Sequence, residues 1–111
     1  MPTERIDLDW LMAHGGTRWL GHVNAGPTHQ MMAEVIDKRT GRGIGLMMRD
    51  TTERTPQGRR TTRIWHVRTH TAPFQHLADA LEALAIVRAA DELEALGEIS
   101  VTAPKGDSRC Q

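Results

Sequence analysis

Alternating apolar and polar positions predict a β-sheet in the middle of the chain. Residues 30–37 and 44–49 each read as a strand, and the turn-forming segment 38–43 between them predicts a hairpin. Residues 61–69 are rich in β-branched and aromatic side chains, which predicts a third antiparallel strand. Residues 18–23 form a brief apolar stretch, which predicts a short additional strand. We therefore expect an antiparallel sheet of three to four strands.

Helical spacing of apolar residues marks the two flanks of this sheet. Residues 4–14 predict a short N-terminal helix, and residues 73–97 predict a long one, whose first half carries its apolar side chains on one face. Residues 98–102 predict a final short strand, and residues 103–111 predict a flexible tail. The expected fold is a single α+β domain over residues 1–111, with the sheet packed under the long C-terminal helix.

The second half of the long helix does not continue the apolar stripe. Arg88 and Asp91 occupy the next positions on that face, whereas Leu93 and Leu96 point about a third of a turn away. The helix is therefore expected to bend, to break near residues 89–90, or to use its second half against another surface. In the last case, Leu93 and Leu96 form a protein interface.

Composition is typical of a globular protein without a membrane segment. Hydrophobic residues make up 39% and charged residues 25% of the 111 positions. No apolar run approaches the roughly 20 residues that a membrane helix needs, and the start lacks the basic and apolar regions of a signal peptide. We expect a cytoplasmic protein with no membrane partner.

Charge is balanced overall but uneven along the chain. Residues 37–70 carry nine basic and three acidic side chains, whereas residues 71–111 carry three basic and seven acidic ones. The middle of the chain therefore has a net charge of +6 and the last part a net charge of −4. Such a dipolar molecule attracts an anionic partner on one side and repels it on the other. The alternative is that basic and acidic parts face each other within the fold or in a homodimer.

Arginine dominates the basic segment, and its forked guanidinium suits phosphate and carboxylate groups. Residues 50–60 are polar and include Pro56 and Gly58, so we expect this connection between two strands to project as an arm. A basic β-ribbon of this kind can enter a nucleic-acid groove. The arginines expected to bind nucleic acid or an acidic protein surface are Arg42, Arg49, Arg54, Arg59, Arg60, Arg63 and Arg68.

No sequence motif points to catalysis, a metal or a cofactor. His66 and His70 would stand roughly 13 Å apart in a strand, too far to share a metal ion. The alternating glycines at 41, 43 and 45 match neither a dinucleotide-binding nor a phosphate-binding loop. The lone cysteine, Cys110, allows no internal disulfide. We therefore expect a small non-enzymatic binding protein that uses no cofactor, most readily one that associates with nucleic acid.

The main alternative is a protein-binding regulator or inhibitor, for example an antagonist of a host defence complex carried by a mobile element. Adjacent methionines at 31–32 and 47–48 place one side chain on each face of a strand, so part of the second sheet face is expected to be apolar. Terminal elements, a homodimer or another protein would cover it. Such a regulator would act through the same arm or through Leu93 and Leu96.

The predicted order of a helix, three antiparallel strands and a helix is similar to that of double-stranded-RNA-binding domains. The segment Gly26-Pro27-Thr28-His29 looks like the loop between their first two strands. Their second helix begins with lysines that grip phosphate, whereas residues 71–76 contain no lysine. The resemblance therefore does not assign the chain to that family.

Overall fold

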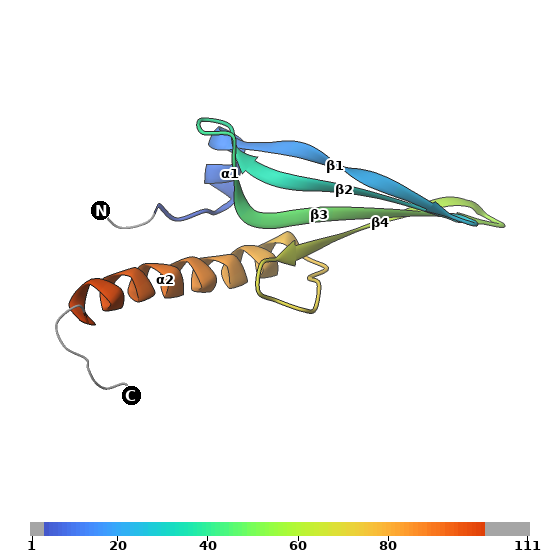
Figure 1. Cartoon of the computed structure of the whole chain (residues 1–111). Coiled ribbons are helices and arrows are strands. Elements are labelled where there is room, and N and C mark those ends of the chain that lie inside the picture. The colour runs from blue at the N-terminus through green and yellow to red at the C-terminus, as the bar shows by residue number, and fades with distance from the viewer. Residues whose placement is uncertain (1–3, 102–111) are drawn as a thin grey trace.

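The structure is a computed structural model that describes residues 4–101 (Figure 1). Along the chain, a short helix is followed by four antiparallel strands and then by a long helix. The elements are α1 (Leu8–His14), β1 (Gly15–Ala25), β2 (Thr28–Asp37), β3 (Arg42–Thr55), β4 (Gly58–Val67) and α2 (Leu77–Val101). Each strand pairs with its neighbour in the chain, so the order across the sheet is β1-β2-β3-β4. The predicted α+β fold with an antiparallel sheet is confirmed.

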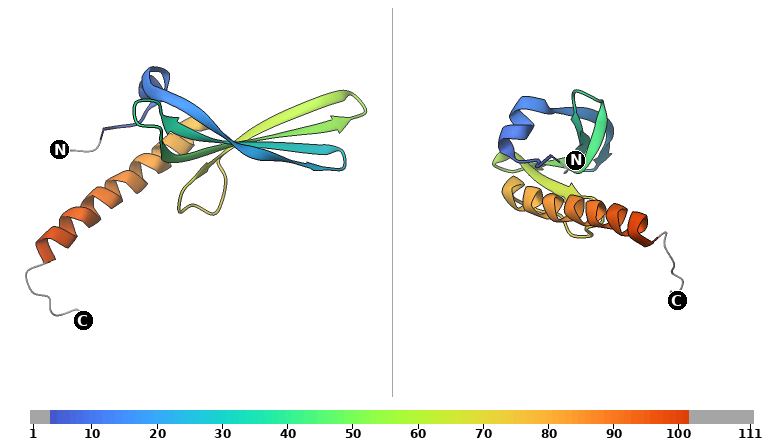
Figure 2. Two further views of the ribbon diagram at one scale, coloured as in Figure 1. Left: turned by 45° about the horizontal axis from the view of Figure 1, so that its top comes forward. Right: turned by 90° about the vertical axis from the view of Figure 1, so that its left-hand side faces the viewer.

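The molecule is elongated, because one end of the sheet extends well beyond the helices. Its principal extents are 65, 33 and 22 Å, and its radius of gyration is 18.5 Å. A compact domain of this length would have a radius of gyration of about 13 Å. The β1–β2 turn and the β3–β4 turn both lie at the far end (Figure 2). We call this projecting part, residues 21–32 and 49–64, the arm, and the rest of the described molecule the base.

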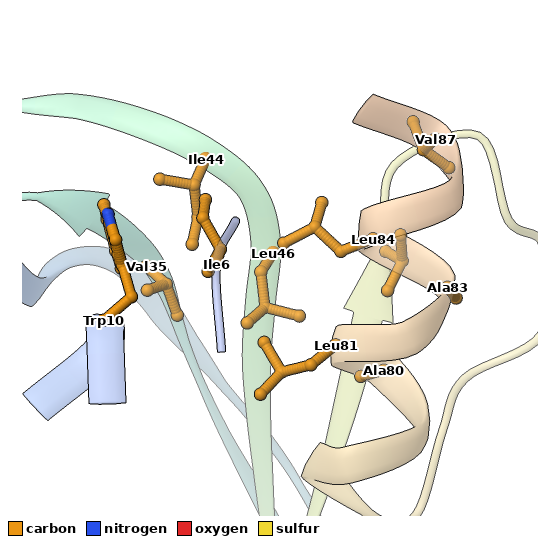
Figure 3. Close-up of a cluster of buried hydrophobic side chains, with 11 residues drawn as sticks. Ile6, Trp10, Val35, Ile44, Leu46, Ala80, Leu81, Ala83, Leu84 and Val87 are labelled. Carbon is orange, nitrogen blue, oxygen red and sulfur yellow. The ribbon is translucent and has the colours of Figure 1, made fainter. Parts of the chain in front are cut away.

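Buried hydrophobic side chains of the described residues all lie in the base. Leu46, Leu84 and Val67 are buried almost completely, with exposed fractions of 1%, 0% and 1%. Trp10 and Ile6 bring the N-terminal segment into the same cluster, beside β3 and α2 (Figure 3). The arm has no such cluster, so its stability depends on strand pairing and on contacts between neighbouring side chains.

The two faces of the sheet have different surroundings. Val35, Leu46 and Val67 stand directly opposite one another on neighbouring strands, and all three are buried in the cluster that the helices complete. We call this side the core face and the other side the outer face. Because side chains alternate between the faces along a strand, every second residue continues the core face onto the arm.

The connection at residues 50–60 projects, as the sequence predicted, but most of it is paired strand that extends the sheet. Residues 50–60 are paired strand on both sides of a short turn at Pro56 and Gln57. Thr52 and Thr61 face each other there, with their hydroxyl oxygens 3.0 Å apart. Threonine is β-branched and favours strands, and cross-strand pairs of this kind stabilise the ladder, which explains why the polar segment is ordered.

The N-terminal elements follow each other without a loop. The side chain of Asp7 caps α1 by accepting a hydrogen bond from the Trp10 N–H at 2.9 Å. A Cβ atom at residue 15 would lie 2.6 Å from the Leu11 carbonyl oxygen, so Gly15 allows the chain to pass directly from α1 into β1. The strand predicted at 18–23 is thus longer, and four strands rather than three separate the helices, unlike the double-stranded-RNA-binding domains.

The C-terminal helix begins later than the sequence predicted. The N–H and carbonyl groups of Phe74 both hydrogen-bond to Trp65 at 2.8 Å. This residue therefore extends the edge of β4 instead of starting a helix, and α2 begins only at Leu77.

The end of α2 also differs from the sequence-based expectation. The helix is continuous through residues 89–90, where a break was one of the expected outcomes. Residues 98–101 are helical, so the strand predicted at 98–102 is wrong over them. Residue 102 and the predicted tail at 103–111 lie outside the described residues. The last described turns of α2 extend beyond the sheet (Figure 1), and use of its second half against another surface stays a prediction.

Candidate functional site

A hollow of about 440 Å³ lies at the end of the arm, where the two hairpins meet. We call it the tip hollow, and its lining contains side chains from all four strands and the β1–β2 turn. The residues that line it are Asn24, Pro27, His29, Met31, Thr52, Arg54 and Arg59. No carboxylate is among them, so the hollow presents hydrogen-bond donors and positive charge.

Two arginines define the charge of the tip hollow. Arg54 on β3 and Arg59 on β4 are directly opposite each other in the strand register, on the core face. Both are exposed, and no ion pair is found for either among residues 4–96. Two adjacent like charges repel each other, so an anion between them would relieve that repulsion.

Hydrogen bonds within and between the two hairpins hold the lining of the tip hollow in place. The Arg54 N–H donates to the Pro27 carbonyl oxygen at 3.1 Å, which links β3 to the β1–β2 turn. The Asn24 amide oxygen contacts His29 Nδ1 across the first hairpin. The Thr55 hydroxyl donates to the Gly58 carbonyl at 2.7 Å and closes the second hairpin. The tip hollow is therefore part of the strand framework.

The other arginines of the predicted site are not gathered with this pair. Arg63 shares the core face, whereas Arg49 and Arg60 belong to the outer face. Arg42 starts β3 at the base, and Arg68 follows β4 there. The sequence could not separate them, because the face of each arginine depends on strand register.

Three of those arginines are also engaged in ion pairs. Arg60 pairs with Glu53 directly across the strands at 2.8 Å. Arg68 pairs with Asp91 and so connects the sheet to α2. The positive charge of this arginine-rich segment is thus partly neutralised by acidic residues on the neighbouring strand and on α2.

Arg63 is the third arginine in an ion pair, and it makes two hydrogen bonds to its partner. Its guanidinium donates to both carboxylate oxygens of Asp50, at 2.6 and 2.9 Å, and lies 5.8 Å from the centre of the Trp65 ring. These hydrogen bonds lower the pKa of Asp50 and raise the pKa of Arg63. Arg63 therefore has a structural role in the arm.

The predicted interface on α2 is exposed. Leu93 and Leu96 have exposed fractions of 69% and 57%. Ile86, which the sequence pattern did not single out, is exposed to 70% and precedes Leu93 by seven residues, two helical turns. These three side chains give the second half of α2 an apolar stripe outside the core.

His66 lies on the outer face of the base, beside Met47 and Leu20, where the sheet borders a hollow of about 420 Å³. Its Nε2 atom is shielded from solvent and has no hydrogen-bond partner among the described residues. Desolvation, followed by the nearby charge of Arg49, lowers the pKa of His66 below its ordinary value of 6.5. This part of the outer face thus combines the apolar side chains of Leu20 and Met47 with a histidine that resists protonation.

Mild acid should destabilise the fold through His66. Its pKa is lower in the folded chain, so the unfolded chain binds the proton first and the free energy of unfolding decreases as the pH falls below about 6.5. The contribution of Asp50 is lost only at lower pH, below its ordinary pKa of 3.8. In urea denaturation between pH 6.5 and about 5, H66Q should therefore show a flatter pH dependence. An unchanged slope in H66Q would contradict this assignment.

The part of the chain that the structure describes contains neither a metal-binding cluster nor a membrane-spanning helix. No three histidine, cysteine, aspartate or glutamate side chains within it are grouped so that they could hold a metal ion. Within the same residues, no helix combines the length and the apolar composition that crossing a membrane requires.

The chain shows no significant similarity to a protein-family model, to a curated protein or to a solved structure. Its function therefore has to be inferred from its own residues.

Proposed function

We propose that the chain is a cytoplasmic, non-enzymatic protein that binds nucleic acid through the arm. The observation that carries the proposal is the tip hollow, where Arg54 and Arg59 lie opposite each other among hydrogen-bond donors. None of the residues that line this hollow is a carboxylate. A guanidinium group makes forked, charge-assisted hydrogen bonds to phosphate. A backbone phosphate is therefore the anion that suits this hollow.

The distribution of charge over the molecule supports the same orientation. Residues 49–64 of the arm contain five arginines and two acidic residues, a net charge of +3. Residues 77–101, which form α2, contain one basic and six acidic residues, a net charge of −5. Because the arm projects away from α2, a polyanion can contact the arm without approaching the acidic helix (Figure 1).

Removing the arginine pair should weaken binding and make it less sensitive to salt. In a fluorescence-anisotropy titration with a labelled oligonucleotide, R54Q/R59Q should lower the affinity roughly tenfold or more at low salt. The slope of log K against log[salt] should become shallower by about 0.7 to 0.9 for each phosphate that the variant no longer neutralises. The Gln side chains retain hydrogen-bonding capacity, so the loss would report charge.

A matched variant tests whether position on the molecule matters. R5Q/R42Q removes the same charge from the base and should reduce affinity by much less, since neither residue lies on the arm. Equal losses in the two variants would indicate non-specific attraction. Full binding by R54Q/R59Q, or no binding of any oligonucleotide by the unmodified chain at low salt, would overturn the proposal.

A second candidate function is binding of a protein through the second half of α2. The exposed stripe of Ile86, Leu93 and Leu96 favours it, because apolar side chains grouped on a projecting helix are typical of contact surfaces. Acidic residues on the same helix favour a partner whose apolar surface is bordered by basic groups. The basic arm of a second copy has that charge, which makes a homodimer the first association to test.

Self-association through α2 should depend on Leu93. In sedimentation velocity, the unmodified chain should form a dimer that weakens with salt, and L93E should sediment as a monomer with unchanged helix content by circular dichroism. A chain that is monomeric at all concentrations, or an L93E dimer as tight as the unmodified one, would rule out this mode of pairing.

A further inference from the structure

A row of aromatic rings on the core face runs from the edge of the base onto the arm, towards the tip hollow. The ring centres of Trp19 and His22 are 5.9 Å apart, and those of His22 and His29 are 5.3 Å apart. The planes meet at 50° and 37°, so the rings do not stack in parallel against one another. Trp19 is exposed to 55%. We call these three residues the ring row.

An irregularity in β1 creates the ring row. Trp19 and His22 are three positions apart, so in a regular strand they would point to opposite faces. The pairing of β1 with β2 shifts between Trp19 and Gly21, which leaves Leu20 as an extra residue. Gly21 has a φ angle of 144°, a conformation that a side chain would disfavour. The bulge turns His22 onto the face of Trp19, and redirecting a side chain is what bulges next to functional sites commonly do.

The ring row and the tip hollow are continuous. His29 belongs to both, because its ring contacts His22 and it also lines the hollow with Arg54 and Arg59. From the base towards the tip, the core face thus presents aromatic rings and then the guanidinium groups of the tip hollow.

Negative charge on this face is neutralised. Asp50 is the one acidic residue that the strand register assigns to the core face of the arm, and both of its carboxylate oxygens accept hydrogen bonds from Arg63. Thr52 and Thr61 contribute hydroxyl groups beside the arginines. The surface therefore combines ring faces, neutral hydrogen-bonding groups and the positive charges of two arginines that have no ion pair within residues 4–96.

We propose that the core face of the arm binds single-stranded nucleic acid, with unpaired bases stacking on the ring row while a neighbouring phosphate occupies the tip hollow. This inference rests on the proposed function and specifies its substrate class. In a duplex the base faces are covered by their neighbours, so exposed rings add nothing there, whereas unpaired bases of any sequence can stack on aromatic side chains. Paired aromatic and cationic groups along one groove are the usual means of holding a single strand.

The test compares three probes of equal length: oligo(dT), oligo(U) and a DNA duplex. The unmodified chain should bind at least one of the single strands more tightly than the duplex. Binding should quench tryptophan fluorescence, because Trp19 is exposed whereas Trp10 is buried and Trp65 is half-buried. W19A should lower single-strand affinity by roughly 5- to 150-fold and leave duplex affinity unchanged. W19F keeps a ring and should retain most of the affinity.

Histidine variants provide a control of position. H29A should weaken single-strand binding, whereas H76A, which changes an exposed histidine outside the ring row, should not. Equal binding of single strands and duplex, with W19A and W19F both unaffected, would overturn the stacking inference but leave nucleic-acid binding intact if R54Q/R59Q still weakens it. Failure to bind any of the probes, together with binding to polyglutamate that R54Q/R59Q abolishes, would overturn both proposals in favour of an acidic protein partner.

Discussion

L84A is expected to lower the free energy of unfolding by about 2 to 5 kcal/mol. Leu84 has no exposed surface and lies between α2 and the sheet, against Leu46 and its neighbours (Figure 3). Truncation would remove buried apolar packing and leave a cavity that the strands, held by their own hydrogen bonds, close only in part. Equilibrium denaturation by urea, followed by far-ultraviolet circular dichroism, measures the change.

Ile86 supplies the matched control for this prediction. It is two residues along the same helix and is exposed to 70%, so I86A should change the free energy of unfolding by no more than about 0.5 kcal/mol. If L84A and I86A had equal effects, α2 would not pack on the sheet through the face that carries Leu84.

W10A should have an effect at least as large, about 3 to 5 kcal/mol. Trp10 is almost fully buried, since its exposed fraction is 6%, and it is the large side chain by which α1 joins the core. Its ring also contacts His14 edge-on at 5.6 Å and lies 5.7 Å from the Arg39 guanidinium. Thermal and urea unfolding would both report the loss.

Comparison with W19A separates the role of Trp10 from that of Trp19. Trp19 lies where the base meets the arm and is mostly exposed, so W19A should cost at most about 1 kcal/mol in the free energy of unfolding. W10A should thus mainly impair stability and W19A mainly impair binding. A large stability loss in W19A would mean that its ring supports the sheet instead of contacting a ligand.

Strand and helix periodicity in the sequence was sufficient for the fold class and most of the elements. The hairpin of β2 and β3 and the apolar face at the start of α2 follow from local pattern alone. The length of β3 did not follow from it, because residues 50–55 are polar on both faces and have no alternation to detect. Their strand state depends on partners in β4, which only the pairing register supplies.

The start of α2 differs from the prediction for another reason. Phe74 has helical spacing with Leu77 and Leu81, and the sequence pattern therefore assigns it to the helix. In the structure it pairs with the open edge of β4 at Trp65 instead. Backbone groups at the edge of a sheet need hydrogen-bond partners, and this tertiary demand outweighs local helix propensity.

The candidate site was predictable as a region but not as a set of residues. Arginine clustering pointed to the arm, yet only Arg54 and Arg59 meet in the tip hollow. The ion pairs of Arg60 and Arg63 required knowledge of register, because their partners lie seven and thirteen positions away in the sequence. His29 comes from the other hairpin, and nothing in its local sequence connects it with the arginines.

The consecutive order of the four strands also has a kinetic consequence. Each strand pairing closes a turn of a few residues, and isolated hairpins of this kind form in about 1 to 10 μs. Contacts between the two helical ends of the chain are different. The Arg88 guanidinium donates to the Glu4 carbonyl oxygen at 3.5 Å, although the two residues are 84 positions apart in the sequence. Closing so long a loop carries a larger entropic cost, and it becomes favourable once a sheet is present to receive both helices. Docking of the helices, rather than formation of the arm, should therefore limit the rate at which this chain folds.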